Sequence, residues 1–305
     1  MNNDLEQNLA RDLIREKRRD RLWRNLRALL WIVIALVYAY FIFGFDSKSA
    51  SLKGPYVSLV RLSGVIMPGS SFSAQKALPV LDNAFKDHAS RGVVIVINSP
   101  GGSPVQASII HDRILALKKR YHKKVVAVGE DTLASGGYLV ATAADKIFVN
   151  RDTLTGSIGV IFSSFGFVDA ISKLGITRRV YTAGSNKDRL DPFEVANPED
   201  VAKLKQVLDQ VHQSFIQDVV AGRGERLIGD HEKLFSGDFW SGQQAVQLGL
   251  ADGTDNLWVI VKKEFGAKSM KDFSARSSLL SDLAGSIGSE LTLRLTESPL
   301  KEQAF

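Results

Sequence analysis

The residues with the clearest chemical potential lie in Asp131–Tyr138, whose sequence DTLASGGY centres on Ser135. This stretch follows an apolar run that predicts a buried strand, Val125–Val128, and precedes a second apolar segment, Tyr138–Ala144. At a strand-to-helix turn, a serine hydroxyl is exposed, the following N–H groups point outward, and glycines let a substrate approach. The pattern favours a nucleophile at Ser135, and a purely structural turn is the alternative.

A serine hydroxyl needs a base to become a nucleophile, and that base is usually a histidine. None of the five histidines lies in a recognisable motif. A lysine can replace histidine if burial removes its water and lowers its pKa. Lys187 lies in the polar loop Thr182–Leu190, and it is the candidate base. An ordinary solvated charge is the alternative.

Two glycines offer a second kind of group to the same chemistry. Gly101 and Gly102 end the segment NSPGG, which follows the β-branched run Gly92–Ile97 and precedes an expected helix. Backbone N–H groups there and at Gly136 could converge on a developing oxyanion. A tight structural turn or a phosphate cradle would use the same glycines, but the chain lacks the GK[ST] signature of a nucleotide loop.

Composition removes several classes of function. The 305-residue chain contains no cysteine, which excludes thiol nucleophiles, thiolate metal sites and disulfides. The histidines show no metal-ligand spacing, so we predict no metal and no cofactor. The formal net charge is +6, and the positive residues are concentrated near the N-terminus.

The N-terminal region predicts a membrane anchor. Met1–Arg27 is a charged amphipathic helix with a basic end, and Ala28–Phe45 has no formal charge. A helix of that length spans roughly 27 Å, close to a bilayer core. A cleaved signal peptide is the alternative, and nucleic-acid binding is disfavoured because the apolar block follows at once. The positive segment should stay in the cytoplasm, which places the chain after the linker Asp46–Gly54 outside it.

The rest of the chain alternates between strand and helix patterns. This alternation predicts an α/β fold of repeated strand-strand-helix units over residues 55–266. Residues 267–305 are predicted to be a polar C-terminal tail. The expected strands are 56–65, 92–97, 124–128, 147–149, 160–162 and 177–182. The expected helices are 73–88, 105–117, 168–174, 197–221, 239–252 and 256–265.

Several motifs together resemble the signal peptide peptidase A family of Ser/Lys proteases. They occur in the family's order and spacing between about Tyr56 and Asp252. The matching segments are Asn98–Gly102 (NSPGG), Leu133–Lys146 (LASGGYLVATAADK), Leu154–Val160 (LTGSIGV), the Lys187 loop and Trp240–Asp252 (WSGQQAVQLGLAD). The resemblance implies a Clp-protease/crotonase-like spiral of strand-strand-helix units, preceded here by one N-terminal transmembrane helix.

The resemblance also implies a role for each candidate residue. Ser135 matches the nucleophile and Lys187 the general base. Ser157 matches the serine that orients the lysine amine, and Gly102 and Gly136 match the oxyanion donors. Long-form relatives carry two repeats, with the lysine in one and the serine in the other. A chain with one repeat is therefore expected to form a homo-oligomeric ring, in which Lys187 of one subunit can serve Ser135 of its neighbour.

The function that follows is a membrane-anchored serine endopeptidase. The implied substrates are remnant signal peptides and other apolar peptides, with no nucleic-acid partner. The implied location is the bacterial inner membrane, with a single pass, the N-terminus in the cytoplasm and the catalytic domain periplasmic or extracytoplasmic. Two alternatives stay open: an inactive membrane-bound scaffold, and a crotonase-like acyl-CoA enzyme that shares the fold and the oxyanion turn.

Overall fold

The computed structural model describes residues 2–43 and 54–274, with side chains described for 17–38 and 54–274. The chain divides into two compact units, Met1–Lys53 and Gly54–Phe305. In the first unit, helix α1 (Asn2–Phe43) joins the predicted amphipathic segment and most of the predicted anchor into one continuous helix. Among the side chains that are described, no helix carries an apolar stretch long enough to cross a bilayer. Most of the predicted linker, 46–53, and residues 275–305 of the predicted tail lie outside the described residues.

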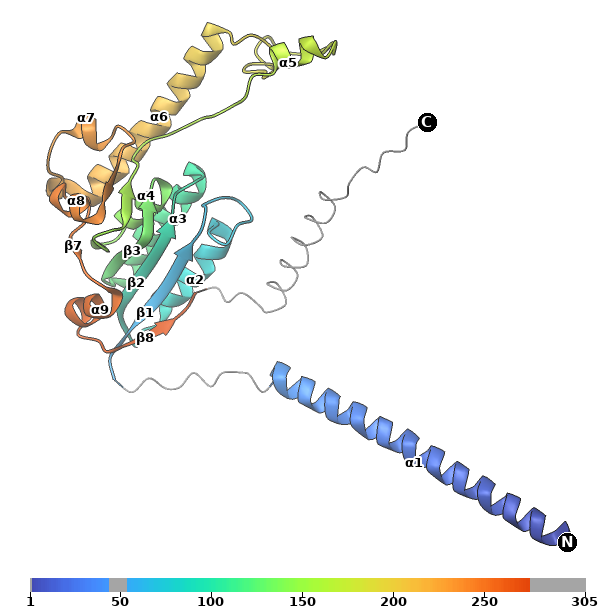
Figure 1. Cartoon of the computed structure of the whole chain (residues 1–305). Coiled ribbons are helices and arrows are strands. Elements are labelled where there is room, and N and C mark those ends of the chain that lie inside the picture. The colour runs from blue at the N-terminus through green and yellow to red at the C-terminus, as the bar shows by residue number, and fades with distance from the viewer. Residues whose placement is uncertain (1, 44–53, 275–305) are drawn as a thin grey trace. The chain divides into compact units, whose positions relative to one another are not determined.

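The second unit is built on an eight-stranded sheet (Figure 1). Its main path runs β6-β5-β3-β2-β1-β8, with β4 pairing both β3 and β7. All neighbouring strands are parallel except β5 and β6. The strands are β1 (Tyr56–Ser63), β2 (Ser90–Ser99), β3 (Val125–Ala134), β4 (Lys146–Val149), β5 (Leu154–Gly156), β6 (Phe239–Ser241), β7 (Gly253–Thr254) and β8 (Ser269–Asp272). The predicted α/β class is confirmed, and the mixed sheet is consistent with the Clp-protease/crotonase type.

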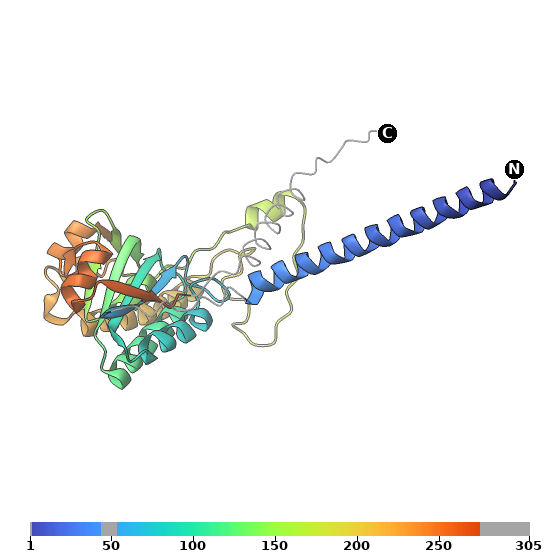
Figure 2. The same ribbon diagram turned by 90° about the horizontal axis from the view of Figure 1, so that it is seen from below.

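Helices cover both faces of this sheet (Figure 2). The larger core cluster packs α2, α3 and α4 against one face, and a smaller cluster packs α9 against the other. Parallel strands buried on both faces are rich in β-branched residues, as β2 is here. The helices of this unit are α2 (Ala74–Lys86), α3 (Pro104–Tyr121), α4 (Gly136–Thr142), α5 (Val168–Lys173), α6 (Pro198–Arg223), the 3₁₀ turn η1 (Gly224–Arg226), α7 (His231–Leu234), α8 (Gly242–Gln247) and α9 (Leu257–Phe265).

Local sequence signals set the ends of the longer helices. The Asn197 side chain accepts a hydrogen bond from the Glu199 N–H and caps α6, with Pro198 at the first helical position, as predicted. Asn256 caps α9 in the same way. Helix α3 has three basic residues in its last turn and is capped by His122, which adopts a left-handed conformation (φ 50°).

Two predicted strands are wrong. Residues 160–162 and 177–182 form no strand, although their β-branched residues favour one. Strand propensity depends on a neighbour to pair with, and this segment leaves the sheet after β5. The short strands β5, β6, β7 and β8 were not expected. The predicted helix 239–252 is too long: its first residues form β6, and only Gly242–Gln247 are helical. Strand β8 pairs with β1 and lies in the segment predicted as the tail.

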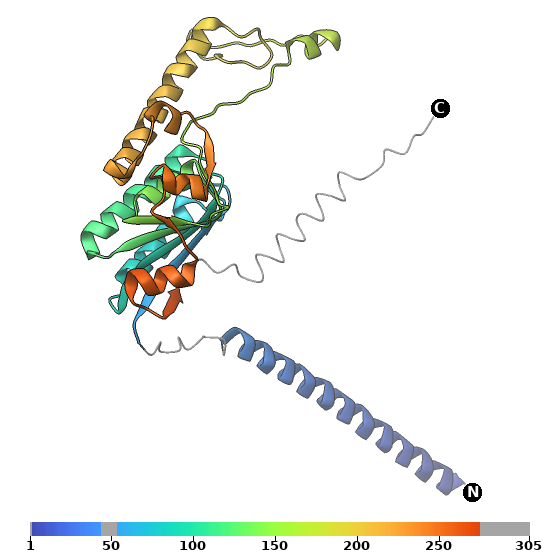
Figure 3. The ribbon, with the colours of Figure 1, turned by 60° about the vertical axis from the view of Figure 1, so that its left-hand side comes forward.

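We call residues 161–197 the arm. It connects the end of the sheet to α6 and contains only one helix, the six-residue α5. Figures 1 and 3 both show it extending beyond the N-terminal end of α6, away from the sheet. Residues 161–167 and 172–188 of the arm are all exposed.

Candidate active site

Ser135 lies at a sharp turn between the end of β3 and the start of α4. Its backbone has φ 51° and ψ −125°, a conformation that residues with a side chain rarely adopt. Neighbouring strands hold it there: Ala134 pairs with Gly156 of β5, and the Ser135 N–H donates to the Gly156 carbonyl at 2.8 Å. Such strain persists only where the surroundings over-determine it, and it is typical of nucleophile turns.

The two glycines predicted as oxyanion donors lie beside this serine. A Cβ on Gly136 would be 3.6 Å from the Gly102 nitrogen, so the two N–H groups belong to one small region. Gly136 opens α4, and the first N–H groups of a helix have no intrahelical acceptor. Gly102 is exposed and has φ 145°; a Cβ there would be 2.1 Å from the Ile66 carbonyl oxygen. Only glycine fits this turn.

Ser157 also lies next to the nucleophile turn. It directly follows Gly156, whose carbonyl accepts from Ser135, and its own N–H donates to the Asp238 carbonyl at 2.7 Å. Ser157 has φ 50°, so it is a second serine with a strained backbone. It directly follows Gly156, the residue that pairs with Ala134, just as Ser135 follows Ala134. Four of the five predicted site residues, Ser135, Ser157, Gly102 and Gly136, are therefore brought together by the sheet.

Lys187 is the residue that the fold does not bring to the others. It lies in the arm, in a turn where its N–H donates to the Gly184 carbonyl at 3.2 Å, and its side chain is exposed. Among the hydrogen bonds of residues 54–274, none joins Lys187 to Ser135 or Ser157. A lysine must lose water to act as a neutral base, so within one chain Lys187 is placed in the wrong environment for that role.

Sequence reasoning missed a histidine that borders the site. The His212 ring nitrogen Nε2 lies 3.1 Å from the carbonyl oxygen of Ile158, the residue after Ser157. Because a carbonyl only accepts, Nε2 must carry the proton and donate. His212 thus ties the loop that bears Ser157 to α6. Its position on the amphipathic helix gave no signal, since only the tertiary fold places this turn of α6 beside the loop.

A buried polar cluster supports the helix that follows Ser135. The Tyr138 hydroxyl donates to the Leu250 carbonyl at 2.8 Å, and burial raises the pKa of Tyr138. Arg223, 2% exposed, binds Asp252 at 2.7 Å and donates to the Gly249 carbonyl. Burial alone would raise the pKa of Asp252, but hydrogen bonds from Arg223 and the Ile147 N–H hold it below its ordinary value. The turn 249–252 therefore holds α4 in place through the Tyr138 hydroxyl.

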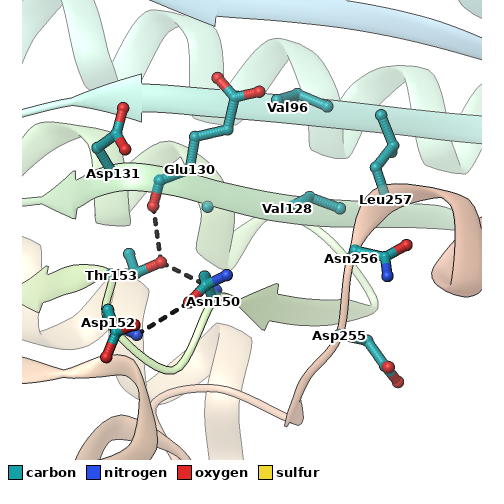
Figure 4. Close-up of a pocket in the computed structure, with 11 residues that line it drawn as sticks. Val96, Val128, Glu130, Asp131, Asn150, Asp152, Thr153, Asp255, Asn256 and Leu257 are labelled. Atoms are coloured by element: carbon teal, nitrogen blue, oxygen red, sulfur yellow. Dashed lines mark hydrogen bonds between the residues drawn. The ribbon is translucent and has the colours of Figure 1, made fainter.

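A pocket of about 650 Å³ lies elsewhere on the sheet (Figure 4). Carboxylates of Glu130, Asp131, Asp152 and Asp255 surround its floor of Val96 and Val128. The Thr153 hydroxyl donates to the Glu130 carbonyl and braces its wall. None of the predicted site residues lines it. In the part of the chain that the structure describes, no three His, Cys, Asp or Glu residues are grouped to hold a metal ion.

Comparisons with known proteins decide the family. The model of peptidase family S49 matches residues 117–268, which include Ser135, Ser157 and Lys187. A putative protease of Synechocystis is 31% identical over 197 residues, which cover 64% of this chain and 68% of that protein. The chain belongs to peptidase family S49. A putative signal peptide peptidase SppA of Enterococcus faecium is 32% identical over 181 residues, 59% of this chain and 52% of that one. The assignment to the signal peptide peptidase A family is confirmed.

Two matches to this S49 chain, both from Brucella, have a name of another kind. A protein of Brucella melitensis named Na⁺/H⁺ antiporter NhaA is 43% identical over 217 residues, 70% of this chain but only 29% of that protein. The chain therefore spans less than a third of that relative, and most of the antiporter lies outside the match.

Proposed function

We propose that this S49 chain is a serine endopeptidase and that Ser135 is its nucleophile. The observation that carries the proposal is the turn itself: a strained serine, held by β5, with the N–H groups of Gly102 and Gly136 beside it. Donors fixed in this way match the requirement for stabilising a tetrahedral oxyanion, often the largest single catalytic contribution.

The reaction is acyl transfer to water through a covalent intermediate. A base takes the Ser135 proton, and the hydroxyl oxygen attacks a peptide carbonyl whose oxygen becomes the oxyanion. The protonated base then gives its proton to the leaving amine. Water, deprotonated by the same base, attacks the acyl-enzyme and releases the acid. No cofactor or metal is required by these steps.

The base in this proposal is Lys187 of a neighbouring subunit, with Ser157 orienting its amine. Two observations support an assembly between copies. Lys187 is exposed within its own chain, and the arm also exposes apolar side chains that a monomer leaves in water, among them Phe165 (80%), Tyr181 (89%) and Val195 (82%). Covering such surface in a homo-oligomeric ring would desolvate the lysine and the apolar groups together.

We further propose that the enzyme acts at a bacterial inner membrane. The uncharged run Ala28–Phe45 and the basic segment before it support a single-pass anchor with a cytoplasmic N-terminus. The catalytic unit would then be periplasmic or extracytoplasmic. Remnant signal peptides and other apolar peptides are the substrates that such a position favours.

Mixing inactive variants tests the base and the ring in one experiment. Ser135→Ala and Lys187→Ala are each expected to be inactive on a fluorogenic leucine- or alanine-rich peptide. If the two residues act across an interface, a randomised equal mixture contains about one competent pair in four and recovers about a quarter of wild-type turnover. Measuring the size of the particles before, during and after mixing confirms that the rings dissociate and reassemble.

The same assay separates the competing functions. No recovery in the mixture, with both single variants inactive, places the dyad within one subunit. Turnover that survives Lys187→Ala removes the lysine as base. A folded, oligomeric wild type without peptidase turnover favours the scaffold, and hydrolysis of an acyl-CoA instead of peptide favours the crotonase-like reaction.

A further inference from the structure

The amino ends of the parallel strands form a common edge of the sheet, which we call the amino edge. The registers fix it: Tyr56 pairs with both Ser90 and Ser269, and Lys146 pairs with Val126. In a parallel sheet the helix before each strand ends at the same edge, so α2, α3 and α9 all finish here. Helix C-termini favour cations, and each of these helices has lysine in its last turn.

The amino edge is strongly basic after its ion pairs are counted. Its four carboxylates are all neutralised: Asp87 by Lys271 at 2.8 Å, Asp145 by Lys118 at 2.7 Å, Glu264 by Lys124 and Lys146 at 2.6 and 2.9 Å, and Asp252 by Arg223 at 2.7 Å. Six further cations are exposed, and none has a carboxylate partner among residues 54–274. They are Lys86, Arg91, Lys119, Arg120, Lys262 and Lys268.

The opposite end of the sheet carries the candidate active site and a pocket whose acidic residues are mostly ion-paired. Ser135, Gly102 and Ser157 follow the carboxyl ends of their strands, and the acidic pocket of Figure 4 opens near the same ends. Three of its four carboxylates have a cation partner: Glu130 pairs with Arg61 at 3.0 Å, Asp152 with Arg151 at 3.1 Å and Asp255 with Lys263 at 3.6 Å. The unpaired cations of the amino edge therefore lie at the end of the catalytic unit away from Ser135.

The covalent connection to the N-terminal unit is also at the amino edge. The described chain enters at Gly54, and Tyr56 begins β1 at the edge itself. The Ser269 hydroxyl, at the start of β8, donates to the Pro55 carbonyl at 3.5 Å. Along the chain, the amino edge is therefore the first part of the catalytic unit after the N-terminal unit.

We propose that the amino edge docks on the headgroups of an anionic lipid surface and holds the Ser135 end of the unit away from it. The inference rests on the proposed anchor. Basic residues near an anionic leaflet each add attraction, which falls off within a Debye length. Docking on this edge would turn a loosely tethered domain into one of fixed orientation.

Because the chain has no cysteine, a single fluorescent label tests this on the full chain. An environment-sensitive dye is placed at His88→Cys, which is exposed at the amino edge, or at Met67→Cys, 49% exposed at the other end. The labelled chains are reconstituted with vesicles of phosphatidylcholine alone or with phosphatidylglycerol. We expect emission at position 88 to rise about threefold with phosphatidylglycerol and to fall back in high salt, while position 67 does not respond.

A charge-reversal pair sharpens the result. Lys119→Glu with Lys262→Glu should abolish the response at position 88. Lys76→Glu with Arg151→Glu changes the net charge equally, at exposed residues of the other end, and should leave it intact. An equal response at positions 67 and 88, or a response at 88 to polyuridylate but not to phosphatidylglycerol, overturns the proposal.

Flotation of the same vesicles distinguishes this inference from the anchor. A chain that floats with both lipids in high salt but shows no response at position 88 keeps its anchor and loses the docking surface. A chain that floats only with phosphatidylglycerol and is released by salt has the docking surface without the anchor. A chain that floats with neither lipid refutes both.

Discussion

The turn at Ser135 and the arm at Lys187 are built in opposite ways. The backbone at Ser135 is held in a sterically unfavourable conformation. The surroundings that hold it are two strands, the start of a helix and the Ile66–Gly102 bridge. In the arm, the contacts are fewer: the Phe167 N–H donates to the Pro192 carbonyl and the Phe167 and Phe193 rings lie 5.5 Å apart. Two ion pairs, Arg178 with Asp191 and Arg189 with Asp200, complete them. Most other side chains of the arm face water.

The difference follows from what each half of the proposed Ser/Lys site needs. A nucleophile and its oxyanion donors need fixed geometry, which a packed sheet edge supplies by itself. A neutral lysine needs the removal of water, which takes a covering surface. In this chain the turn at Ser135 is packed, whereas Lys187 is exposed. Mutations in the two regions should therefore have different effects. At the turn they should lower both activity and the free energy of unfolding, and in the arm they should lower activity alone.

The largest effect is expected at Ser135. Ser135→Ala and Ser135→Gly should both lower kcat by on the order of 10⁴-fold or more, because the nucleophile is gone. Their stabilities should differ in an unusual direction. At φ 51° a glycine is unstrained, so the glycine variant should be about 1 kcal/mol more stable than the alanine variant. Urea unfolding measures this, and equal stabilities would show that the turn relaxes without strain.

Gly102→Ala should be next, with kcat falling roughly 10²-fold, the usual cost of losing an oxyanion donor. The added Cβ would meet the Ile66 carbonyl oxygen at 2.1 Å, so the turn must move. Gly175→Ala is the matched control in the arm: its φ is also positive, at 65°, but a Cβ there meets nothing within 4 Å. Peptide turnover and thermal melting of both variants give the comparison. Full activity in Gly102→Ala would remove this N–H from the oxyanion site.

Phe193→Ala tests the arm side of the comparison. Losing the contact with Phe167 and the Arg178 guanidinium, which lies 5.0 Å from the Phe193 ring centre, should loosen the arm and lower activity about tenfold through misplacement of Lys187. The free energy of unfolding should change by less than about 0.5 kcal/mol, because the ring packs on nothing in the sheet's two core clusters.

The control for the arm variant is a phenylalanine of the core. Phe85→Ala, at a fully buried residue, should cost about 3–5 kcal/mol of stability. A Phe193→Ala variant that loses stability on the same scale would mean that the arm is part of the cooperative fold.

Sequence predicted the parts of this molecule that rest on local chemistry. The capped start of α6 at Asn197, the buried run of β2 and the turn at Ser135 each carry their own signal in neighbouring residues. The predicted strands 160–162 and 177–182 are wrong because such runs form strands only beside a partner strand. Among the described residues, no strand pairs with them. The placement of Lys187 and the contact of His212 with Ile158 depend on tertiary geometry, which no local pattern encodes.

His212 connects the two regions. It lies on α6, which begins at the end of the arm, and the His212 ring bonds the loop that bears Ser157. Removing the donor with His212→Leu should lower kcat a few-fold at unchanged KM, because the loop loses about 1 kcal/mol of support but no substrate contact. His212→Gln keeps an N–H donor of similar reach and should recover most of the rate. Steady-state kinetics of the pair decide the matter. If leucine and glutamine behave alike, the ring serves packing only, and the Ser157 loop is held by its bond to Asp238 and by β5 without help from the helix that carries the arm.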